Sequence, residues 1–241
     1  MTEEEWLASE SSFAMLCYLK SRSGRYRLRK HFGRAPTVRK LRLFLVECSR
    51  RVSGYLADER SFHALEVAER FADNRATSEE LASAAVAAQA AYSDVRSTDR
   101  REEYYAAAVV LEAAREERRF NWTSALELCI YGADVAARLV GIAKANGENH
   151  ELVEGEEKHQ AALIRDLFGN CPSAESPTLG HKSQSVIDLA KAIYEERSFE
   201  GMPILADALE DSGCCDDSIL AHLRNGQEHI KGCWLLDLVL N

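Results

Sequence analysis

The sequence predicts an all-α protein: a multi-helix bundle built on a central helical hairpin, followed by a small C-terminal helical module. Apolar residues recur with a helical period along most of the chain, and strand-like alternation appears nowhere over a useful length. The 241 residues include only 4 Pro and 13 Gly, and Ala and Glu are abundant, which favours helix over sheet. An apolar content of 46% is sufficient for a buried core.

The central hairpin is predicted in residues 36–74. Its first helix carries an apolar stripe at alternating three- and four-residue steps, formed by Val38, Leu41, Leu45, Cys48, Val52 and Tyr55. This stripe is widened by Leu43, Phe44 and Val46, so we expect the helix to be buried on more than one side. Asp58 can cap the second helix. The residues expected to face inward from that helix are Phe62, Leu65, Ala68 and Phe71 or Ala72.

The remaining helices of residues 1–169 are expected to pack on this hairpin. Two short ones come first, over residues 3–8 after a Thr2/Glu5 capping box and then from residues 11–12. Glycines and a proline predict a basic loop over 21–36. After the hairpin, Thr77 and Glu80 form a second capping box, and Ser97-Thr98-Asp99 is expected to cap the following helix. The last two helices of the bundle are expected over residues 124–145 and 150–167.

Residues 170–182 predict a linker, because NCPSAESPTLGHK holds two Pro and a Gly and lacks a helical period. The chain therefore divides into an N-terminal bundle, residues 1–169, and a C-terminal module, residues 183–241. Helices of the module are expected over residues 183–197, 203–213, 216–224 and 231–240. The total expected is roughly nine to eleven helices.

Charge is distributed unevenly along the chain, whose formal net charge is −9. Residues 11–46 carry ten Lys or Arg and no acid, whereas residues 47–241 hold 20 bases against 35 acids, a net of −15. No apolar run approaches the roughly 18 residues that a membrane span needs, and the acidic start MTEEEWLASE does not resemble a secretory signal. We expect a cytoplasmic protein with no membrane partner, whose seven cysteines are reduced.

Several segments carry a resemblance to a family of helical proteins that is expanded in planctomycete bacteria. They include RKLRLFLVECSRR (39–51), DERSFHALEVAERFADN (58–74), LIRDLFGN (163–170), AIYEERSFEGMPILADALEDSGC (192–214) and HIKGCWLLDLVL (229–240). The resemblance implies a bacterial helical protein, with no activity and no site residue to carry over. The chain departs from the family in having CPSAESP where a Pro-Phe-Arg-Pro-like run is usual, and in a longer basic loop.

Four residues near the C-terminus could form a zinc set: Cys215, His222, His229 and Cys233. Only the last two have the i, i+4 spacing of a helical ligand pair, and no close CxxC or HxxxH pair completes a site. We therefore expect core thiols, half-exposed histidines and no stoichiometric metal or other cofactor.

Other candidate chemistry has structural explanations. Glu156 and His159 make one Glu-x-x-His pair, but a di-iron bundle needs two such pairs, so we expect a solvated face there. Cys48 and Cys129 lie on apolar stripes without a neighbouring base, as packing thiols do. His63 is expected on a helix surface, and no phosphate loop or nucleophile elbow is present.

The strongest functional hint is the basic run SRSGRYRLRKHFGR, residues 21–34. Its cations could neutralise phosphates while its aromatic residues stack on bases, or the run could dock on the acidic body of the chain. The cations concerned are Arg25, Arg27, Arg29, Lys30 and Arg34. Arg39, Lys40 and Arg42 could instead form the polar side of the central helix. Our leading hypothesis is a non-catalytic adaptor that binds another protein; a nucleic-acid-associated protein using residues 20–42 is the alternative, and an enzyme ranks third.

Replacing those five cations by Ser separates the two hypotheses. If they contact phosphates, nucleic-acid binding falls with salt at a log–log slope of roughly −3.5 to −4.5, and the variant loses that binding without losing stability. If the run docks on the acidic body, the variant has a lower melting temperature and unchanged weak binding. A salt titration and a thermal melt of the same variant decide between them, because screening weakens both contacts.

Overall fold

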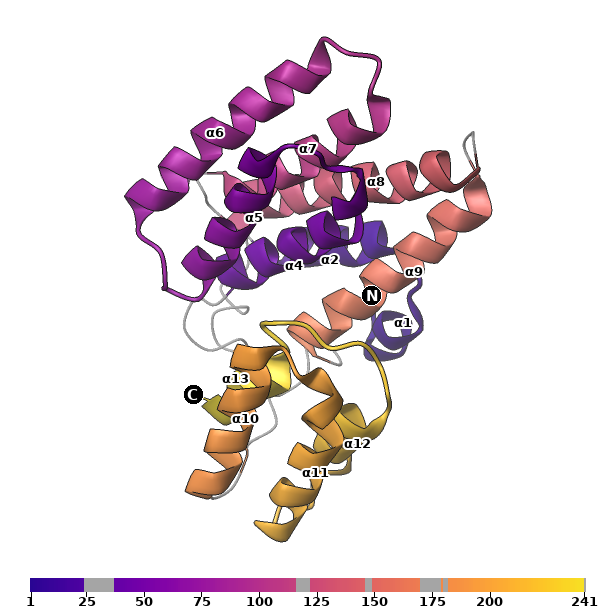
Figure 1. The fold of residues 1–241 in the computed structure, drawn as a ribbon. Helices are drawn as coiled ribbons and strands as arrows, with labels where there is room; N and C mark the ends of the chain where they lie inside the picture. Colours follow the sequence, from indigo (N-terminus) through magenta and orange to yellow (C-terminus); the bar gives the residue numbers. More distant parts are fainter. Residues whose placement is uncertain (24–36, 116–121, 146–148, 170–178, 180–181, 241) are drawn as a thin grey trace.

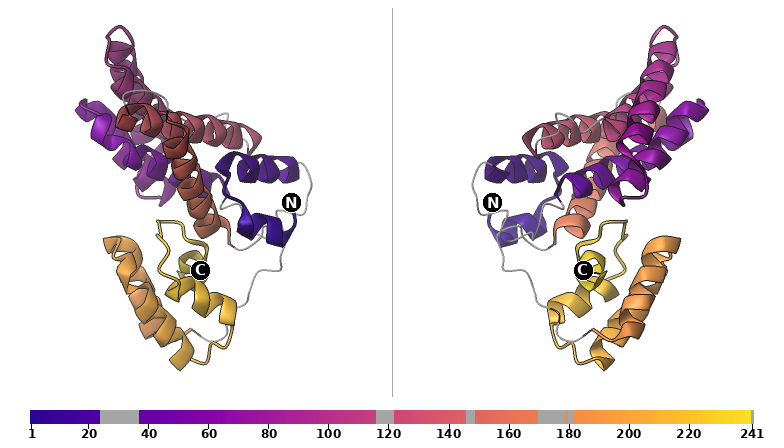
Figure 2. Two further views of the ribbon diagram at one scale, coloured as in Figure 1. Left: turned by 90° about the vertical axis from the view of Figure 1, so that its right-hand side faces the viewer. Right: turned by 90° about the vertical axis from the view of Figure 1, so that its left-hand side faces the viewer.

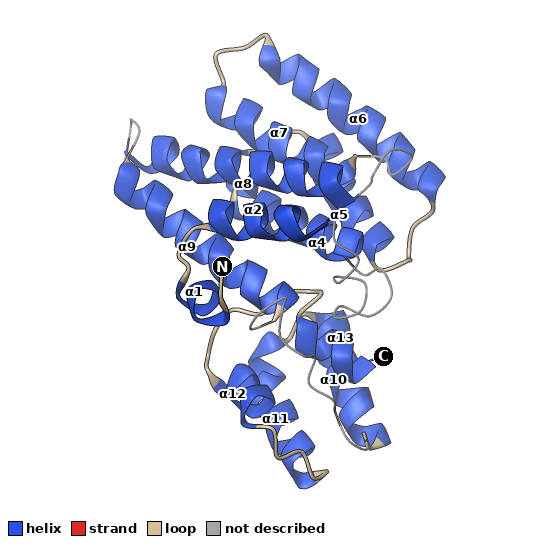
Figure 3. Cartoon of the chain, turned by 180° about the vertical axis from the view of Figure 1, so that it is seen from behind, coloured by secondary structure: helices blue, strands red, loops and turns tan. Residues whose placement is uncertain are grey.

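The computed structural model describes residues 1–23, 37–115, 122–145, 149–169, 179 and 182–240. In these ranges the chain forms twelve α-helices and two 3-10 turns, η1 (Ser53–Tyr55) and η3 (Phe199–Gly201), and no strand (Figure 3). The bundle contains α1 (Glu3–Ala8), α2 (Ser12–Ser23), α4 (Thr37–Arg51), α5 (Glu59–Ala72), α6 (Ser78–Arg96), α7 (Arg101–Ala114), α8 (Trp122–Ala145) and α9 (His150–Phe168). The module contains α10 (Gln184–Glu196), α11 (Met202–Asp211), α12 (Asp217–Arg224) and α13 (Trp234–Leu240). The all-α prediction is confirmed, with one helix more than the expected maximum.

Helix α4 lies at the centre of the bundle and packs against α5, α7, α8 and α9 (Figure 1). Because it has neighbours on several sides, its apolar residues are buried around most of its circumference. Those under 3% exposed are Leu41, Leu43, Phe44, Leu45, Val46 and Cys48. The expectation of a helix buried on more than one side is confirmed. No helix in the described ranges combines the length and the apolarity needed to cross a membrane.

Small residues allow the helices around α4 to approach one another closely. Helices α6, α7 and α8 bury mostly alanine and valine. Gly132 of α8 allows this close packing, since a Cβ at that position would lie 2.6 Å from Cδ2 of Leu45 and would force that side chain to shift. Ala84 and Ala88 on the small-residue face of α6 are buried.

The predicted inward face of α5 is confirmed at Leu65, Ala68 and Ala72 and is wrong at Phe62. Its buried stripe runs through Ser61, Ala64, Leu65, Ala68 and Ala72, and Leu65 is 4% exposed. Phe62 was expected to face inward but is 40% exposed, because it lies one residue, or about 100°, away from the start of that stripe. The aromatic ring suggested burial, whereas the alanines and Ser61 form the surface that packs.

Helix caps follow the sequence at most positions. Both predicted capping boxes are present, at Thr2 with Glu5 and at Thr77 with Glu80. Asp58 accepts from the backbone N–H of Arg60 and begins α5. The predicted cap of α7 is wrong, since its N-cap is Arg100, which makes no side-chain cap hydrogen bond.

Arg42 of α4 is buried at 1% exposure rather than lying on a polar side. Its guanidinium donates to the backbone carbonyls of Ala113 at 2.6 Å and Arg115 at 3.1 Å, at the C-terminal end of α7. Those carbonyls have no partner within their helix, so Arg42 satisfies them and complements the negative end of the helix dipole. The guanidinium also lies over the ring of Phe71, 5.2 Å from its centroid.

The C-terminal module has a hydrophobic cluster of its own. Residues of α10, α11, α12 and α13 form it, and Leu205, Ile219 and Leu235 are fully buried within it. The module adjoins the end of the bundle where α9 ends, as both side views in Figure 2 show. Ile230 belongs to the C-terminal segment in sequence but is buried in the cluster of the bundle. The domain boundaries and the linker, most of which lies outside the described residues, stay predictions.

Burial of α4 predicts the effect of truncating Leu45, which is 1% exposed. Leu45→Ala is expected to lower the free energy of unfolding by about 2–5 kcal/mol, because it removes buried contacts and leaves a cavity facing Gly132. Phe62→Ala, at 40% exposure, serves as the comparison and is expected to cost less than about 1 kcal/mol. Chemical denaturation of both variants measures this; an equal loss would show that α4 is not the centre of the core.

Candidate functional site

A charged layer joins the bundle to the module, and Arg39 of α4 lies at its centre. Its guanidinium donates to the two carboxylate oxygens of Asp237 in α13, at 3.1 and 2.9 Å, and to Asp73 at 3.2 Å. Burial opposes the charged guanidinium, but Asp237, Tyr194 and Asp73 outweigh burial and raise the pKa of Arg39 above its usual value. Tyr194 of α10 donates its hydroxyl to Asp73.

Two further cations cross the same boundary. Lys40 donates to the carbonyl of Leu167 at 2.6 Å and lies 3.3 Å from Asp237. Lys231 of the C-terminal segment lies 3.4 Å from Asp73 and 3.5 Å from Glu69. Arg39 and Lys40 therefore hold the module in place, and do not form the polar outer side of the central helix.

A buried polar cluster lies beside this layer, and we call it the DHHC cluster: Asp166, His222, His229 and Cys233. One ligand-capable atom of each residue lies within 4.8 Å of those of the other three. Asp166 and Cys233 are 0% exposed, and each histidine is 6% exposed. The cluster combines residues from α9, α12 and the segment between α12 and α13.

The Asp166 carboxylate is the centre of the DHHC cluster. Its Oδ1 lies 2.6 Å from Nδ1 of His229 and 3.4 Å from Nε2 of His222, and its Oδ2 accepts from the backbone N–H of Ile230 at 3.0 Å. Burial alone would raise the pKa of this carboxyl, but the hydrogen bonds from His222 and His229 outweigh burial and lower it. The carboxylate therefore stays ionised although it is fully buried.

The remaining edges of the cluster involve Cys233. Its Sγ lies 3.3 Å from Nε2 of His222 and 3.9 Å from Nδ1 of His229. Burial and the neighbouring Asp166 charge raise the pKa of the Cys233 thiol well above its usual value. The far nitrogen of His222, Nδ1, faces the side-chain amide of Gln227 at 2.9 Å and the indole N–H of Trp234 at 3.3 Å.

Local geometry explains how residues 225–233 reach the bundle. The segment follows α12 through Gly226, whose φ of +67° favours glycine. Gly232 has φ +87°, and a Cβ there would lie 2.7 Å from Leu43 and 3.0 Å from Leu167. Backbone therefore contacts the bundle directly at Gly232. The predicted helix over 231–240 begins only at Trp234, so His229 and Cys233 are brought together by a turn and not by helical spacing.

The structure thus brings together three of the four residues of the predicted zinc set and replaces the fourth. Cys215 is exposed, and its thiol lies 3.6 Å from the Gly213 carbonyl oxygen, outside the cluster. The expectation of half-exposed histidines is wrong, because both are buried at 6% exposure. Asp166 takes the place of Cys215. A signal for it was present: Asp166 lies among buried apolar neighbours in LIRDLF, where an unpaired carboxylate would be costly.

The Glu156/His159 pair also differs from the expected solvated face. Glu156 is 3% exposed and accepts three hydrogen bonds from the Arg51 guanidinium, at 2.7 to 3.0 Å. His159 lies 3.4 Å from Glu228, and burial together with Arg51 lowers the pKa of His159. Cys48 and Cys129 are fully buried, burial raises the pKa of each thiol, and His63 is exposed, as expected.

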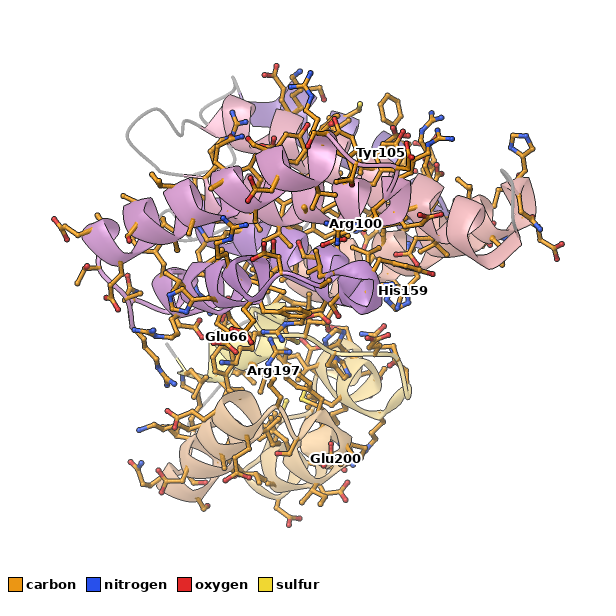
Figure 4. All side chains as sticks on the ribbon, turned by 45° about the horizontal axis from the view of Figure 1, so that its top comes forward. Glu66, Arg100, Tyr105, His159, Arg197 and Glu200 are labelled. Atoms are coloured by element: carbon orange, nitrogen blue, oxygen red, sulfur yellow. The ribbon has the colours of Figure 1, made fainter. Side chains whose placement is uncertain are left out.

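A hollow of about 440 Å³ opens next to the DHHC cluster, where the bundle and the module meet. Its apolar wall comes from the module and includes Phe199, Met202, Leu223 and Ile230, and its charged residues are Glu47, Arg197, Glu200 and Glu228. In Figure 4, Arg197 lies where bundle and module meet, with Glu66 above on the bundle and Glu200 below on the module. His229 belongs both to the hollow and to the DHHC cluster.

Charges around the hollow are partly neutralised within the chain. Arg197 pairs with Glu69 and lies 3.7 Å from Glu47. Burial raises the pKa of Glu47, and its arginine neighbours Arg197 and Arg50 only partly offset that rise. Glu200 and Glu228 are exposed, so the rim is acidic.

The five predicted binding cations, Arg25, Arg27, Arg29, Lys30 and Arg34, lie outside the described residues. Of the basic segment 20–42, the structure shows Lys20, Arg39, Lys40 and Arg42 in contacts within the chain; Lys20 lies 2.8 Å from Glu127. These four cations are therefore already engaged.

Comparison with known proteins gave no match to a family model, a curated protein or a solved structure. The resemblance to the planctomycete family stays a prediction.

The charged layer predicts different costs for two arginines that join bundle and module. Arg39→Gln is expected to lower the free energy of unfolding by about 3 kcal/mol, because it leaves buried Asp73 and half-buried Asp237 without their main cation. Arg75→Gln breaks an exposed pair with Glu195, 2.8 Å apart, and is expected to cost about 0.5 kcal/mol or less. Denaturant unfolding compares them; equal small losses would mean that the layer contributes no stability.

Proposed function

We propose that this chain is a non-catalytic protein-binding protein that receives a short segment of another protein in the hollow between the bundle and the module. The observation that carries the proposal is the combination of an apolar wall with an acidic rim. Phe199 is half-buried and Pro203 is exposed there. Glu200 and Glu228, which are also exposed, line the same hollow. A volume of about 440 Å³ is within the usual range of binding pockets.

The charges define the chemistry of the partner. Glu47, Glu200 and Glu228 line the hollow against one cation, Arg197, which Glu69 and Glu47 already neutralise. A partner segment with a Lys or Arg next to an apolar side chain complements both features. The net charge of −9 adds long-range attraction for such a basic segment.

Binding explains the hollow better than catalysis. Among the described residues that line it there is no Ser, Thr, Cys or Lys that could act as a nucleophile. Glu47 has the raised pKa of a general acid, but it lies against Arg197 at 3.7 Å and Arg50 at 3.9 Å, as a structural carboxylate does. The buried thiols Cys48 and Cys129 have raised pKa values, which oppose formation of a reactive thiolate.

A displayed library of random peptides, selected against the purified chain, tests this function. Selected peptides are expected to combine a basic residue with an adjacent apolar one. Their affinity, measured by fluorescence anisotropy, is expected to fall about tenfold or more in the double variant Glu200→Arg, Glu228→Arg, a loss of about 1.4 kcal/mol. The matched control is Glu66→Arg, Glu196→Arg, which makes the same charge change at exposed sites outside the hollow.

The outcomes are distinct. Retained affinity in the control and lost affinity in the hollow variant support the proposal. Equal loss in both variants would show non-specific attraction to an acidic protein and would contradict it. Selection of no peptide, or of peptides indifferent to the hollow variant, would contradict it as well.

A further inference from the structure

We propose that Asp166, His222, His229 and Cys233 bind one zinc ion, which fastens the C-terminal module to α9. This inference does not depend on the proposed protein-binding function. It opposes the expectation of a metal-free protein, which was based on an incomplete ligand set. The ligand missing from that set is Asp166, which lies 56 residues before His222 in the sequence.

The distances between the four ligand atoms suit a zinc ion. Zinc bonds of about 2.0 Å to nitrogen or oxygen and about 2.3 Å to sulfur give a tetrahedron with edges of about 3.3–3.5 Å. The edges found between ligand atoms are 2.6, 3.3, 3.4 and 3.9 Å, and the other two are no longer than 4.8 Å. Those four edges bracket the tetrahedral values, so small side-chain shifts are enough to place an ion among these atoms.

The chemical types of the four ligands also suit zinc. One carboxylate oxygen, two imidazole nitrogens and one sulfur form the mixed set that a borderline-soft ion such as zinc binds. Calcium and magnesium take six or more oxygen ligands, which the cluster does not supply. All four residues are buried, which is typical of a closed structural site and not of a catalytic site with an open position.

Charge also favours a cation at this position. Asp166 is a carboxyl group with no exposed surface, and burial of an unbalanced carboxylate charge is costly. A zinc ion with the Asp166 carboxylate, a Cys233 thiolate and two neutral histidines forms a neutral unit. Binding releases the thiol proton of Cys233 to solvent, as zinc binding to cysteine generally does.

The surrounding residues hold the ligands in place. Asp166 presents one oxygen to the site while the other accepts from the Ile230 N–H at 3.0 Å. His222 presents Nε2, and the Gln227 side chain lies 2.9 Å from its Nδ1; with the amide oxygen turned to Nδ1, Gln227 accepts the Nδ1–H of a metal-bound imidazole. The competing arrangement has no metal: Nδ1 of His222 accepts from Gln227 and Trp234, and Nε2–H faces Asp166 or Cys233.

Zinc content of the native chain is the direct test. The untagged protein, expressed with zinc and dialysed against metal-free buffer, is expected to retain one zinc per chain by elemental analysis. Cys233→Ser is expected to weaken zinc affinity about 100-fold or more in a chelator competition. Cys215→Ser is the control, since its thiol is exposed and outside the cluster, and it is expected to bind zinc as the native chain does.

A second measurement does not need a variant that folds. In the native chain, Co²⁺ added to the zinc-depleted protein is expected to show the visible bands of a tetrahedral thiolate site. A metal-free preparation that takes up neither zinc nor Co²⁺ would overturn the proposal. Equal loss of zinc in Cys215→Ser and Cys233→Ser would overturn it too.

Discussion

The arrangement of the C-terminal module depends on one buried carboxylate, Asp166. A fully buried carboxylate needs hydrogen-bond partners. The partners that the structure shows for Asp166 do not come from the bundle. His222, His229 and the Ile230 N–H all come from the C-terminal segment. Docking of that segment therefore satisfies Asp166 and, in doing so, places Gly232 against Leu43 and Leu167 and Ile230 in the core of the bundle.

Helix α4 links this junction to the rest of the fold. Its apolar residues form the centre of the bundle, while Arg39 and Lys40 bind α13 and the end of α9, and Arg42 binds the end of α7. Long aliphatic stems allow these basic residues to lie in an apolar environment while their charged ends reach carbonyls and carboxylates. A positively charged sequence on a central helix is therefore compatible with a largely buried position, and it need not signal an anionic ligand.

The sequence predicted the local structure well and the site only in part. Periodicity and caps depend on residues that are neighbours in the sequence. The sequence could therefore predict the bounds of α1, the caps at Asp58 and Thr77 and the buried sides of α4. The DHHC cluster combines α9 with residues more than 50 positions later, and no local pattern predicts such a contact. One signal existed: on α9, Glu156, Gln160 and Asp166 lie among apolar residues on the buried face, and each has a partner from another segment. Buried polar residues in an apolar stripe indicate a long-range partner, although not its identity.

In our proposal a zinc ion joins the four residues of the DHHC cluster and thereby joins the module to the bundle. Anomalous diffraction from crystals of the native protein, recorded on both sides of the zinc absorption edge, tests it most directly. We expect one anomalous peak about 2.0–2.3 Å from Asp166 Oδ1, His222 Nε2, His229 Nδ1 and Cys233 Sγ. The absence of a peak at this position, together with a direct hydrogen bond between His229 and Asp166 like the one of 2.6 Å in this structure, would contradict the zinc proposal.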